Sequence, residues 1–336
     1  MESSAGVAER GGAPVPVGGR AGRADRPLRR GEEAHGAAGR PERSLDGAEA
    51  IAHVRDYLAL TKPRIISLLL WTTVATMIVA RPSGLALSTV LWTCLGGYLA
   101  AGGAGAINHY LDRDIDARMG RTKKRPIVEG RIEPIHGLIF GIVLGALAGV
   151  QLAITVNPLS AVLALTGLVG YVGLYTAWLK PRTPQNIVIG GAAGAMPPLV
   201  GWAAATGGLT LEAFVPFLII FLWTPPHFWA LALLISDDYK RTGVPMLPVV
   251  RGAEFTRRRI LAYSVVLVAF TLVPVATGMF GAIYLAAAAI LGIGFLALAA
   301  ILLREPSKRA ALRLYLCSLA YLFLLFAAMA VDRLAA

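Results

Sequence analysis

Long apolar segments recur along the chain from about residue 65 to the C-terminal end, and short polar segments separate them. A helix needs about 20 mostly apolar residues to cross the hydrocarbon of a bilayer, because each residue advances it by about 1.5 Å. The pattern therefore predicts an all-α integral membrane protein, a bundle of nine transmembrane helices, at residues 65–81, 86–107, 136–155, 159–179, 186–206, 212–235, 260–279, 282–303 and 311–331.

The composition agrees with this prediction. Of the 336 residues, 56% are hydrophobic and only 15% are charged, which is too apolar for an ordinary water-soluble domain. The net charge of +12 is no sign of nucleic-acid binding, because the basic residues lie in short segments between apolar runs instead of forming a patch on a soluble surface. The expected partners are the anionic headgroups of a lipid bilayer or an anionic substrate.

The distribution of basic residues predicts the orientation in the membrane. With the N-terminus inside, 30 of the 32 Lys and Arg residues lie on the cytoplasmic side, and only Arg81 and Arg333 lie outside. This asymmetry follows the positive-inside rule. We expect a multi-pass protein of a bacterial plasma (inner) membrane, with a cytoplasmic N-terminus and an extracytoplasmic C-terminus. The long polar connections 108–135 and 236–259 then share the cytoplasmic face.

The segment before the first span differs in character from the rest of the chain. Residues 1–48 are rich in Gly, Ala, Pro, Arg and Glu and contain no apolar run, so they predict a disordered cytoplasmic tail. The acidic residues of this tail argue against a transit peptide. Residues 49–336 form the membrane domain, in which residues 53–60 mix charged and apolar positions and favour a short interfacial helix before the first span.

The strongest candidate for chemistry lies at the cytoplasmic end of the second span. Asn108, Asp112 and Asp116 are spaced at i, i+4 and i+8, which places their side chains on one helix face if the helix continues. Oxygen ligands of this kind suit Mg²⁺, which takes one or two carboxylates together with phosphate oxygens. Arg121 and Arg125 follow and supply cations for phosphate groups. The alternative, carboxylates that only balance a basic loop, does not require this spacing.

A second acidic cluster, Asp237 and Asp238, ends the sixth span at the same face and is followed by Lys240. Two carboxylate sites that face one another can hold two metal ions on one diphosphate. Departure of the diphosphate would leave an allylic carbocation, which requires a site shielded from water. Lys180, which ends the fourth span, is either a further diphosphate contact or an interfacial anchor.

An unusual motif, Pro225-Pro226-His227-Phe228-Trp229, lies inside the sixth span. The Pro pair predicts a break in the helix with a pocket beside it. His227 precedes Asp238 by eleven residues, so we expect both on nearly one helix face, about 16 Å apart. Three roles remain open for His227: a hydrogen-bonded core imidazole, a ligand of haem iron, or a catalytic contact.

Taken together, these segments resemble the UbiA-type intramembrane prenyltransferases, and within them the protohaem IX farnesyltransferases. The resemblance covers roughly residues 50–330. The Asn-x3-Asp-x3-Asp motif is typical of the whole superfamily, whereas Thr-Pro-Gln-Asn at 183–186 and Pro-Pro-His-Phe-Trp at 225–229 are typical of the haem branch. The other stretches that carry it are 57–65, 108–126, 175–180, 187–198 and 238–248.

The resemblance implies a central cavity, Mg²⁺, farnesyl diphosphate as donor and haem B as acceptor. The implied reaction joins farnesyl to a haem vinyl group, and water then adds to give haem O for a respiratory oxidase. A haem A synthase or terminal oxidase assembly is the implied partner. By position, the metal ligands are Asn108, Asp112, Asp116, Asp237 and Asp238, of which all but Asp237 are predicted catalytic, and the substrate contacts are Arg64, Arg121, Arg125, Lys180, Lys240, His227 and Trp229.

One departure from the superfamily pattern bears on the metal count. The second motif is commonly Asp-x3-Asp, but Thr242 stands four residues after Asp238, and Arg241 stands four after Asp237. One metal ion or two are therefore compatible with the sequence.

Two other functions compete with haem farnesylation: prenyl transfer to a quinone precursor or chlorophyll-like acceptor, and membrane transport. A transporter would place its ionisable residues near the membrane midplane, not at one face.

Overall fold

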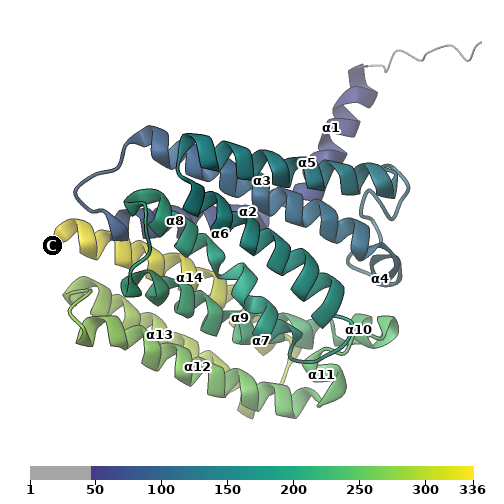
Figure 1. The fold of residues 1–336 in the computed structure, drawn as a ribbon. Coiled ribbons are helices and arrows are strands. Elements are labelled where there is room, and N and C mark those ends of the chain that lie inside the picture. Colours follow the sequence, from purple (N-terminus) through teal and green to yellow (C-terminus); the bar gives the residue numbers. More distant parts are fainter. Residues whose placement is uncertain (1–46) are drawn as a thin grey trace, which may run out of the picture. The chain divides into compact units, whose positions relative to one another are not determined.

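The computed structural model describes residues 47–336, so the predicted tail at 1–48 lies outside the described residues except for its last two positions. Within 47–336 the protein is helical, without strands (Figure 1). The elements are α1 (Gly47–Thr61), α2 (Pro63–Ala80), α3 (Leu87–Leu111), α4 (Arg113–Arg118), α5 (Pro134–Thr155), α6 (Pro158–Val169), the π-helix η1 (Gly170–Leu179), α7 (Asn186–Gly194), α8 (Met196–Thr206), the 3₁₀ turn η2 (Leu211–Ala213), α9 (Phe214–Leu234), α10 (Ser236–Thr242), α11 (Leu247–Val250), α12 (Ala253–Ala276), α13 (Ala282–Arg304) and α14 (Lys308–Ala335).

Nine helical segments in the described part of the chain are long and apolar enough to cross a membrane, which confirms the predicted number of spans. Three of the nine are composite: α6 continues into η1, α7 into α8, and η2 into α9. The composite span of α7 and α8 runs from Asn186 to Thr206, the predicted range. A helix is present at the predicted residues 53–60 as part of α1, which packs on α5 through an edge-to-face contact of Tyr57 with Phe140, 5.0 Å between ring centroids. Its place at the membrane interface stays a prediction.

The exterior of the bundle is apolar. Large aliphatic side chains stand exposed along α5 and α13, such as Ile139, Leu147, Ile290 and Ile293. Exposed apolar surface on this scale requires an apolar surrounding, because a soluble protein would bury it. The chain is therefore a membrane protein.

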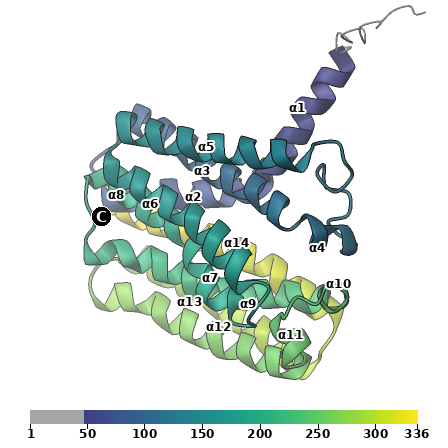
Figure 2. The ribbon, with the colours of Figure 1, turned by 45° about the vertical axis from the view of Figure 1, so that its right-hand side comes forward.

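The two long polar connections lie at one end of the bundle. Helix α4 of the first connection contacts α10 of the second, and both views place α4, α10 and α11 together, far from the C-terminus (Figures 1 and 2). This confirms that 108–135 and 236–259 share a face. That the face is cytoplasmic stays a prediction from the basic residues.

The prediction for the sixth span is wrong in two respects. Helix α9 runs through Pro225 and Pro226 without a break, because membrane helices satisfy or tolerate the carbonyl groups that Pro frees. The helix ends after Leu234, close to the predicted end of the span, and does not continue to Asp238: Ile235, with φ −116° and ψ 27°, leaves the helical region, and α10 starts anew. His227 and Asp238 therefore lie on separate helices, and the expected common face does not exist.

Helices α3 and α5 approach each other through glycines. A β-carbon built on Gly103 would lie 2.6 Å from the carbonyl oxygen of Gly141 and 3.0 Å from the amide nitrogen of Gly145. Both atoms belong to the backbone and cannot turn away. The close approach of α3 and α5 therefore depends on the absence of a side chain at Gly103, as at other helix contacts in membranes.

We expect Gly103→Ala to lower the thermal unfolding temperature of the detergent-solubilised protein. Overpacking typically costs about 1–3 kcal/mol, which exceeds the gain of up to about 1 kcal/mol from replacing Gly by Ala in a helix. Gly294→Ala in α13 is the matched control, because no atom lies within 4 Å of the position that a β-carbon would take there. The control should keep or raise the unfolding temperature. Equal temperatures for both variants would contradict the packing argument.

Candidate active site

Asn108, Asp112 and Asp116, called here the carboxylate stripe, keep their helical spacing where α3 meets α4. Asp112 joins the two helices in a right-handed helical conformation, so the backbone spacing continues across the joint. The amide of Asp112 donates to the Asn108 carbonyl at 2.9 Å, and the amide of Asp116 donates to the Asp112 carbonyl at 2.8 Å. All three side chains are buried, with 4%, 4% and 2% exposure in chain order. The predicted common face is confirmed as geometry.

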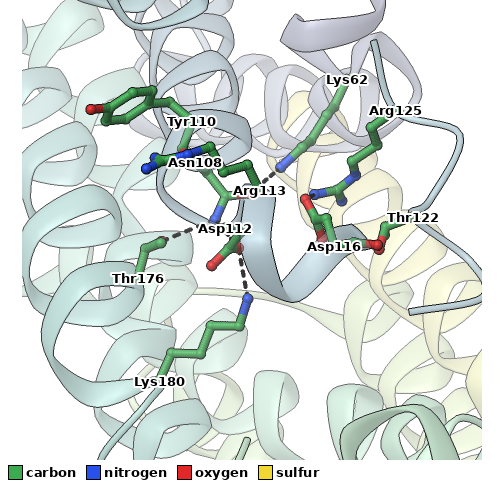
Figure 3. Close-up of polar contacts among 10 residues, drawn as sticks. All are labelled: Lys62, Asn108, Tyr110, Asp112, Arg113, Asp116, Thr122, Arg125, Thr176 and Lys180. Atoms are coloured by element: carbon green, nitrogen blue, oxygen red, sulfur yellow. Dashed lines mark hydrogen bonds and ion pairs between the residues drawn. The ribbon is translucent and has the colours of Figure 1, made fainter. Parts of the chain in front are cut away.

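Asn108 and Asp112 form the centre of a polar network (Figure 3). Asn108 Nδ2 donates to Asp112 Oδ2 at 2.7 Å and to Thr176 Oγ1 at 3.2 Å. Two lysines complete the network from other elements: Lys180 Nζ donates to Asp112 Oδ2 at 2.6 Å, and Lys62 Nζ donates to Asn108 Oδ1 at 2.7 Å. Three segments of the chain, namely Lys62 before α2, helix α3 itself and η1 with the adjoining Lys180, therefore fix the orientation of one amide and one carboxylate.

Lys62 owes its position to an unusual backbone conformation. It lies between α1 and α2 with φ 59° and ψ 55°, the left-handed region, and it is the only non-glycine residue at 47–336 with positive φ. Such a conformation is disfavoured for a residue with a side chain, and it persists where surrounding contacts hold it. Burial lowers the pKa of the Lys62 ammonium group to about 7, and the charge of Arg125 acts in the same direction.

Asp116 forms its own ion pair, with Arg125. The backbone carbonyl of Asp116 also accepts a hydrogen bond from Thr122 Oγ1 at 3.1 Å, which fixes the turn after α4. Burial raises the pKa of the Asp116 carboxyl, and the charge of Arg125 opposes that shift. Arg125 thus keeps a cation next to a carboxylate that is almost inaccessible to solvent.

The π-helix η1 presents its polar groups to this network. Thr176 Oγ1 donates to the carbonyl of Tyr171, five residues earlier, at 2.9 Å, and the rings of Tyr171 and Tyr175 stack at 5.5 Å between centroids. Lys180 follows directly, its amide bonded to the Tyr175 carbonyl at 2.9 Å. π-helical turns are rare and occur often at functional sites. The wider turn brings Tyr171 and Thr176 to one side of the helix.

The second acidic segment meets the first through Asp238. Both of its carboxylate oxygens lie 3.7 Å from the position that a β-carbon on Gly120 would take, and the carboxylate pairs with Arg241. Asp237 is exposed and forms no ion pair with the described residues. Thr242, in the place of a second carboxylate, donates its hydroxyl to the Asp238 carbonyl at 3.1 Å. The segment therefore offers one inward carboxylate, not two.

Tyr239 belongs to the second acidic segment, and its hydroxyl is affected by the charges of both segments. The side chain is buried, and burial raises the pKa of its hydroxyl to about 12. The nearby charge of Arg121 opposes this shift, whereas Asp112 and Asp238 add to it, so charges of both segments act on the same hydroxyl.

An apolar cavity of about 250 Å³ begins beside the network. Lys62, Gly105 and Tyr171 line it near the carboxylates, and it extends between α2, α3, α6 and α8 to Gly97 and Val200. The positions of Gly105 and Gly97 on α3 give it a depth of about 12 Å at 1.5 Å per residue. Its walls suit a flexible hydrocarbon chain whose polar end remains at the network.

The other predicted substrate contacts are spread more widely. Arg64, Arg121 and Lys240 are exposed and form no side-chain hydrogen bond or ion pair within the described part of the protein. Trp229 is 2% exposed and stands edge-on to Tyr263 of α12, 5.3 Å between centroids. Trp229 thus packs against α12 and not against the carboxylates. Residues that sequence reasoning left out of the site are Lys62, Thr176, Tyr171 and Tyr239.

The described part of the chain combines nine helices of membrane-spanning length with a buried network of basic and acidic side chains. The UbiA prenyltransferase family matches residues 69–327, and the chain belongs to this family. A protein named protoheme IX farnesyltransferase from Marinobacter nauticus is 50% identical over 278 residues, which cover 83% of this chain and 92% of that protein. One of the same name from Roseiflexus sp. (strain RS-1) is 55% identical over 290 residues, 86% of this chain.

The relatives differ in length. The chain spans 54% of the Roseiflexus protein and 48% of a relative of the same name from Chloroflexus aurantiacus, about half the length of each.

Solved structures support the fold. A digeranylgeranylglyceryl phosphate synthase has a TM-score of 0.71 at 20% identity, covering 85% of this chain and 100% of that chain. A UbiA homolog from Archaeoglobus fulgidus, bound to DMAPP and Mg²⁺, has a TM-score of 0.59 at 17% identity, covering 82% and 99%.

Proposed function

We propose that this protein transfers the farnesyl group of farnesyl diphosphate to a vinyl group of protohaem IX (haem B) and so forms haem O. The observation that carries the proposal is the identity of 50–55% with proteins named protoheme IX farnesyltransferase over 83–86% of the chain. In this reaction the carbon–oxygen bond of the donor breaks, and diphosphate leaves with the electron pair. The vinyl group forms the new carbon–carbon bond, and water adds to the resulting cation with loss of a proton.

Asn108, Asp112 and Asp116 fit a magnesium site by their chemistry. They supply an amide oxygen and two buried carboxylates, and Mg²⁺ takes one or two carboxylates with substrate phosphate oxygens. No group of three His, Cys, Asp or Glu side chains suited to a metal occurs at 47–336, so the amide and the diphosphate must complete the ligand set. Bound Mg²⁺ would neutralise the diphosphate and favour its departure. Asp238, with Asp237 beside it, is the proposed second site.

The cations of the network have a second role in this proposal. Lys180 and Arg125 each pair with a carboxylate of the stripe, and Lys62 holds the amide between them. A diphosphate bound over the carboxylates offers these cations oxygens that carry more negative charge. Three exposed cations are proposed to attract the diphosphate over a longer range. They are Arg121, in the connection 108–135, and the more distant Arg64 and Lys240.

The apolar cavity is the proposed site of the farnesyl chain. In this proposal C1 of the donor lies at the network, where Lys62 and Tyr171 line the cavity, and the isoprene units lie between α2, α3, α6 and α8. The ring of Tyr171, which lines the cavity and stacks on Tyr175, would provide π-electron density beside the carbon that becomes cationic. Apolar walls also exclude water until the new bond forms.

The acceptor and the cellular placement complete the proposal. His227 and Trp229, both on α9, are the proposed haem-side residues. The basic end of the bundle is proposed to face the cytoplasm of a bacterial cell, because the connections that lie on the cytoplasmic side of a membrane protein carry most of its Lys and Arg. The product leaves in the membrane toward a haem A synthase or terminal oxidase assembly.

Haem extraction and mass analysis test the proposal directly. Bacterial cells that lack their own haem O synthase receive the full chain, and their haems are separated and weighed. We expect a haem heavier than haem B by one farnesyl and one hydroxyl group. Unchanged haem B despite normal membrane expression would refute the acceptor assignment, and a prenylated phenol in the same extract would indicate a quinone-precursor acceptor instead.

A further inference from the structure

The imidazole of His227 is held in a fixed plane between two aromatic rings. Trp223, one turn earlier on α9, stacks on it at 4.2 Å between centroids with an interplanar angle of 17°. Tyr315 of α14 covers the ring at 4.9 Å and 27°. Trp223 is tied to α14 as well, because its Nε1 donates to the carbonyl of Ser318 at 2.8 Å. The ring therefore cannot tilt without moving two helices.

The hydrogen bonds of Ser318 determine which ring nitrogen of His227 carries the proton. Ser318 Oγ lies 2.6 Å from His227 Nδ1 and 2.6 Å from the carbonyl oxygen of Tyr315. A serine hydroxyl has one hydrogen, and a carbonyl oxygen can only accept. The hydroxyl hydrogen must point to Tyr315, because two oxygens this close repel each other without one. Nδ1 therefore donates to Ser318, and the lone pair of the neutral ring lies on Nε2.

Nε2 is left without a protein partner. It forms no hydrogen bond within the described part of the chain, and it is not among the polar atoms that are fully buried there without a partner. His227 forms no ion pair with any residue at 47–336 either. The imidazole is partly buried, and the lone pair of Nε2 is not used by any donor of the described residues. It lies seven residues, or about 10 Å, from the end of α9 at 1.5 Å per residue.

We propose that Ser318 is a positioning residue that holds His227 in the Nδ1–H tautomer, so that Nε2 binds the iron of the haem acceptor. Metal-binding histidines commonly donate their other ring N–H to an oxygen, which fixes the tautomer and raises ligand basicity. Here the oxygen is a hydroxyl whose own hydrogen is fixed by a carbonyl. The inference rests on the proposed function for the identity of the acceptor, and iron ligation would fix the porphyrin centre while a vinyl group at its edge reacts.

The test is a spectroscopic titration of the purified full chain with haem B, separate from any farnesyl transfer. For the wild type we expect saturable binding and, in the ferrous state, a resonance Raman band of iron–histidine stretching. His227→Ala should lose that band, and added imidazole should restore axial ligation. Ser318→Ala should bind haem about 10–100-fold more weakly, the usual effect of removing such a partner, and Ser318→Thr, which keeps a hydroxyl, should recover part of the affinity.

Ser264→Ala is the matched control, because Ser264 is also fully buried in a membrane helix and donates to a backbone carbonyl at 2.7 Å but contacts no imidazole. It should bind haem as the wild type does. An iron–histidine band that persists in His227→Ala, its absence from the wild type, or equal affinities of Ser318→Ala and Ser264→Ala would each overturn the inference. If haem O still forms in those cases, the proposed function stands. If no haem O forms and no haem binds, the proposed function itself fails.

Discussion

Replacing Asp112 by Asn is expected to reduce farnesyl transfer by about 10²–10³-fold, the usual effect of removing one group that stabilises developing charge in a transition state. Asp112 accepts hydrogen bonds from Asn108 and Lys180 and is almost completely buried. The substitution keeps the size of the side chain but removes the charge that would hold Mg²⁺. Initial rates with farnesyl diphosphate and haem B, measured over a range of Mg²⁺ concentrations, should show both a lower kcat/KM and a higher Mg²⁺ requirement.

Asp114→Asn is the control for this variant. Asp114 lies two residues later, in α4, but its side chain is 81% exposed and contacts only Arg113, at 4.0 Å. The loss of one carboxylate there changes the net charge of the loop by the same amount without touching the stripe. We expect it to keep nearly full activity. If both variants lose activity equally, the effect is one of overall loop charge; if Asp112→Asn stays within tenfold of the wild type, Asp112 does not hold the metal.

The fold could be predicted from the sequence because hydropathy acts over long stretches. Nine membrane helices can be predicted from nine apolar segments, because lipid is the solvent and each helix satisfies its own backbone hydrogen bonds. The uneven distribution of Lys and Arg among the polar segments predicts the orientation. The stripe of Asn108, Asp112 and Asp116 could be predicted equally well, because helical periodicity is local and the joint at Asp112 keeps the helical conformation. Composite spans did not disturb the prediction, because a break inside an apolar segment leaves its length unchanged.

The residues that contact the stripe could not be predicted from the sequence in the same way. Tyr171 and Thr176 would point about 140° apart on an α-helix at 3.6 residues per turn, and only the π-helical turn brings them together. Lys62 reaches Asn108 through a left-handed backbone conformation that no propensity favours for Lys. The end of the sixth span agrees with the prediction, but the break predicted at Pro225 and Pro226 is absent, because the surrounding bundle supports a continuous helix. In each case tertiary contacts override a local preference.

Replacing Lys180 by Gln should reduce kcat/KM for farnesyl diphosphate by about 10²-fold, since truncating one partner of a buried charge pair costs about 2–5 kcal/mol and about 1.4 kcal/mol is tenfold. Lys180 is 8% exposed and bonds Asp112 Oδ2 at 2.6 Å. Lys180→Arg should not restore activity, because the planar guanidinium does not fit a site shaped for a compact ammonium group. Arg182→Gln is the control, because Arg182 is exposed and bonds only the carbonyls of Ala177 and Trp178.

The double variant Asp112→Asn with Lys180→Gln distinguishes a shared role from two separate ones. If carboxylate and ammonium act on the same Mg²⁺-diphosphate unit, removing the second after the first should cost much less than either removal alone, because residues that act as a unit are non-additive. Each single variant leaves an uncompensated buried charge, whereas the double variant leaves none. Kinetics of all four proteins in one membrane preparation give the coupling. Strictly additive losses would mean that Lys180 meets the substrate independently of Asp112, and the ion pair between them would then be structural only.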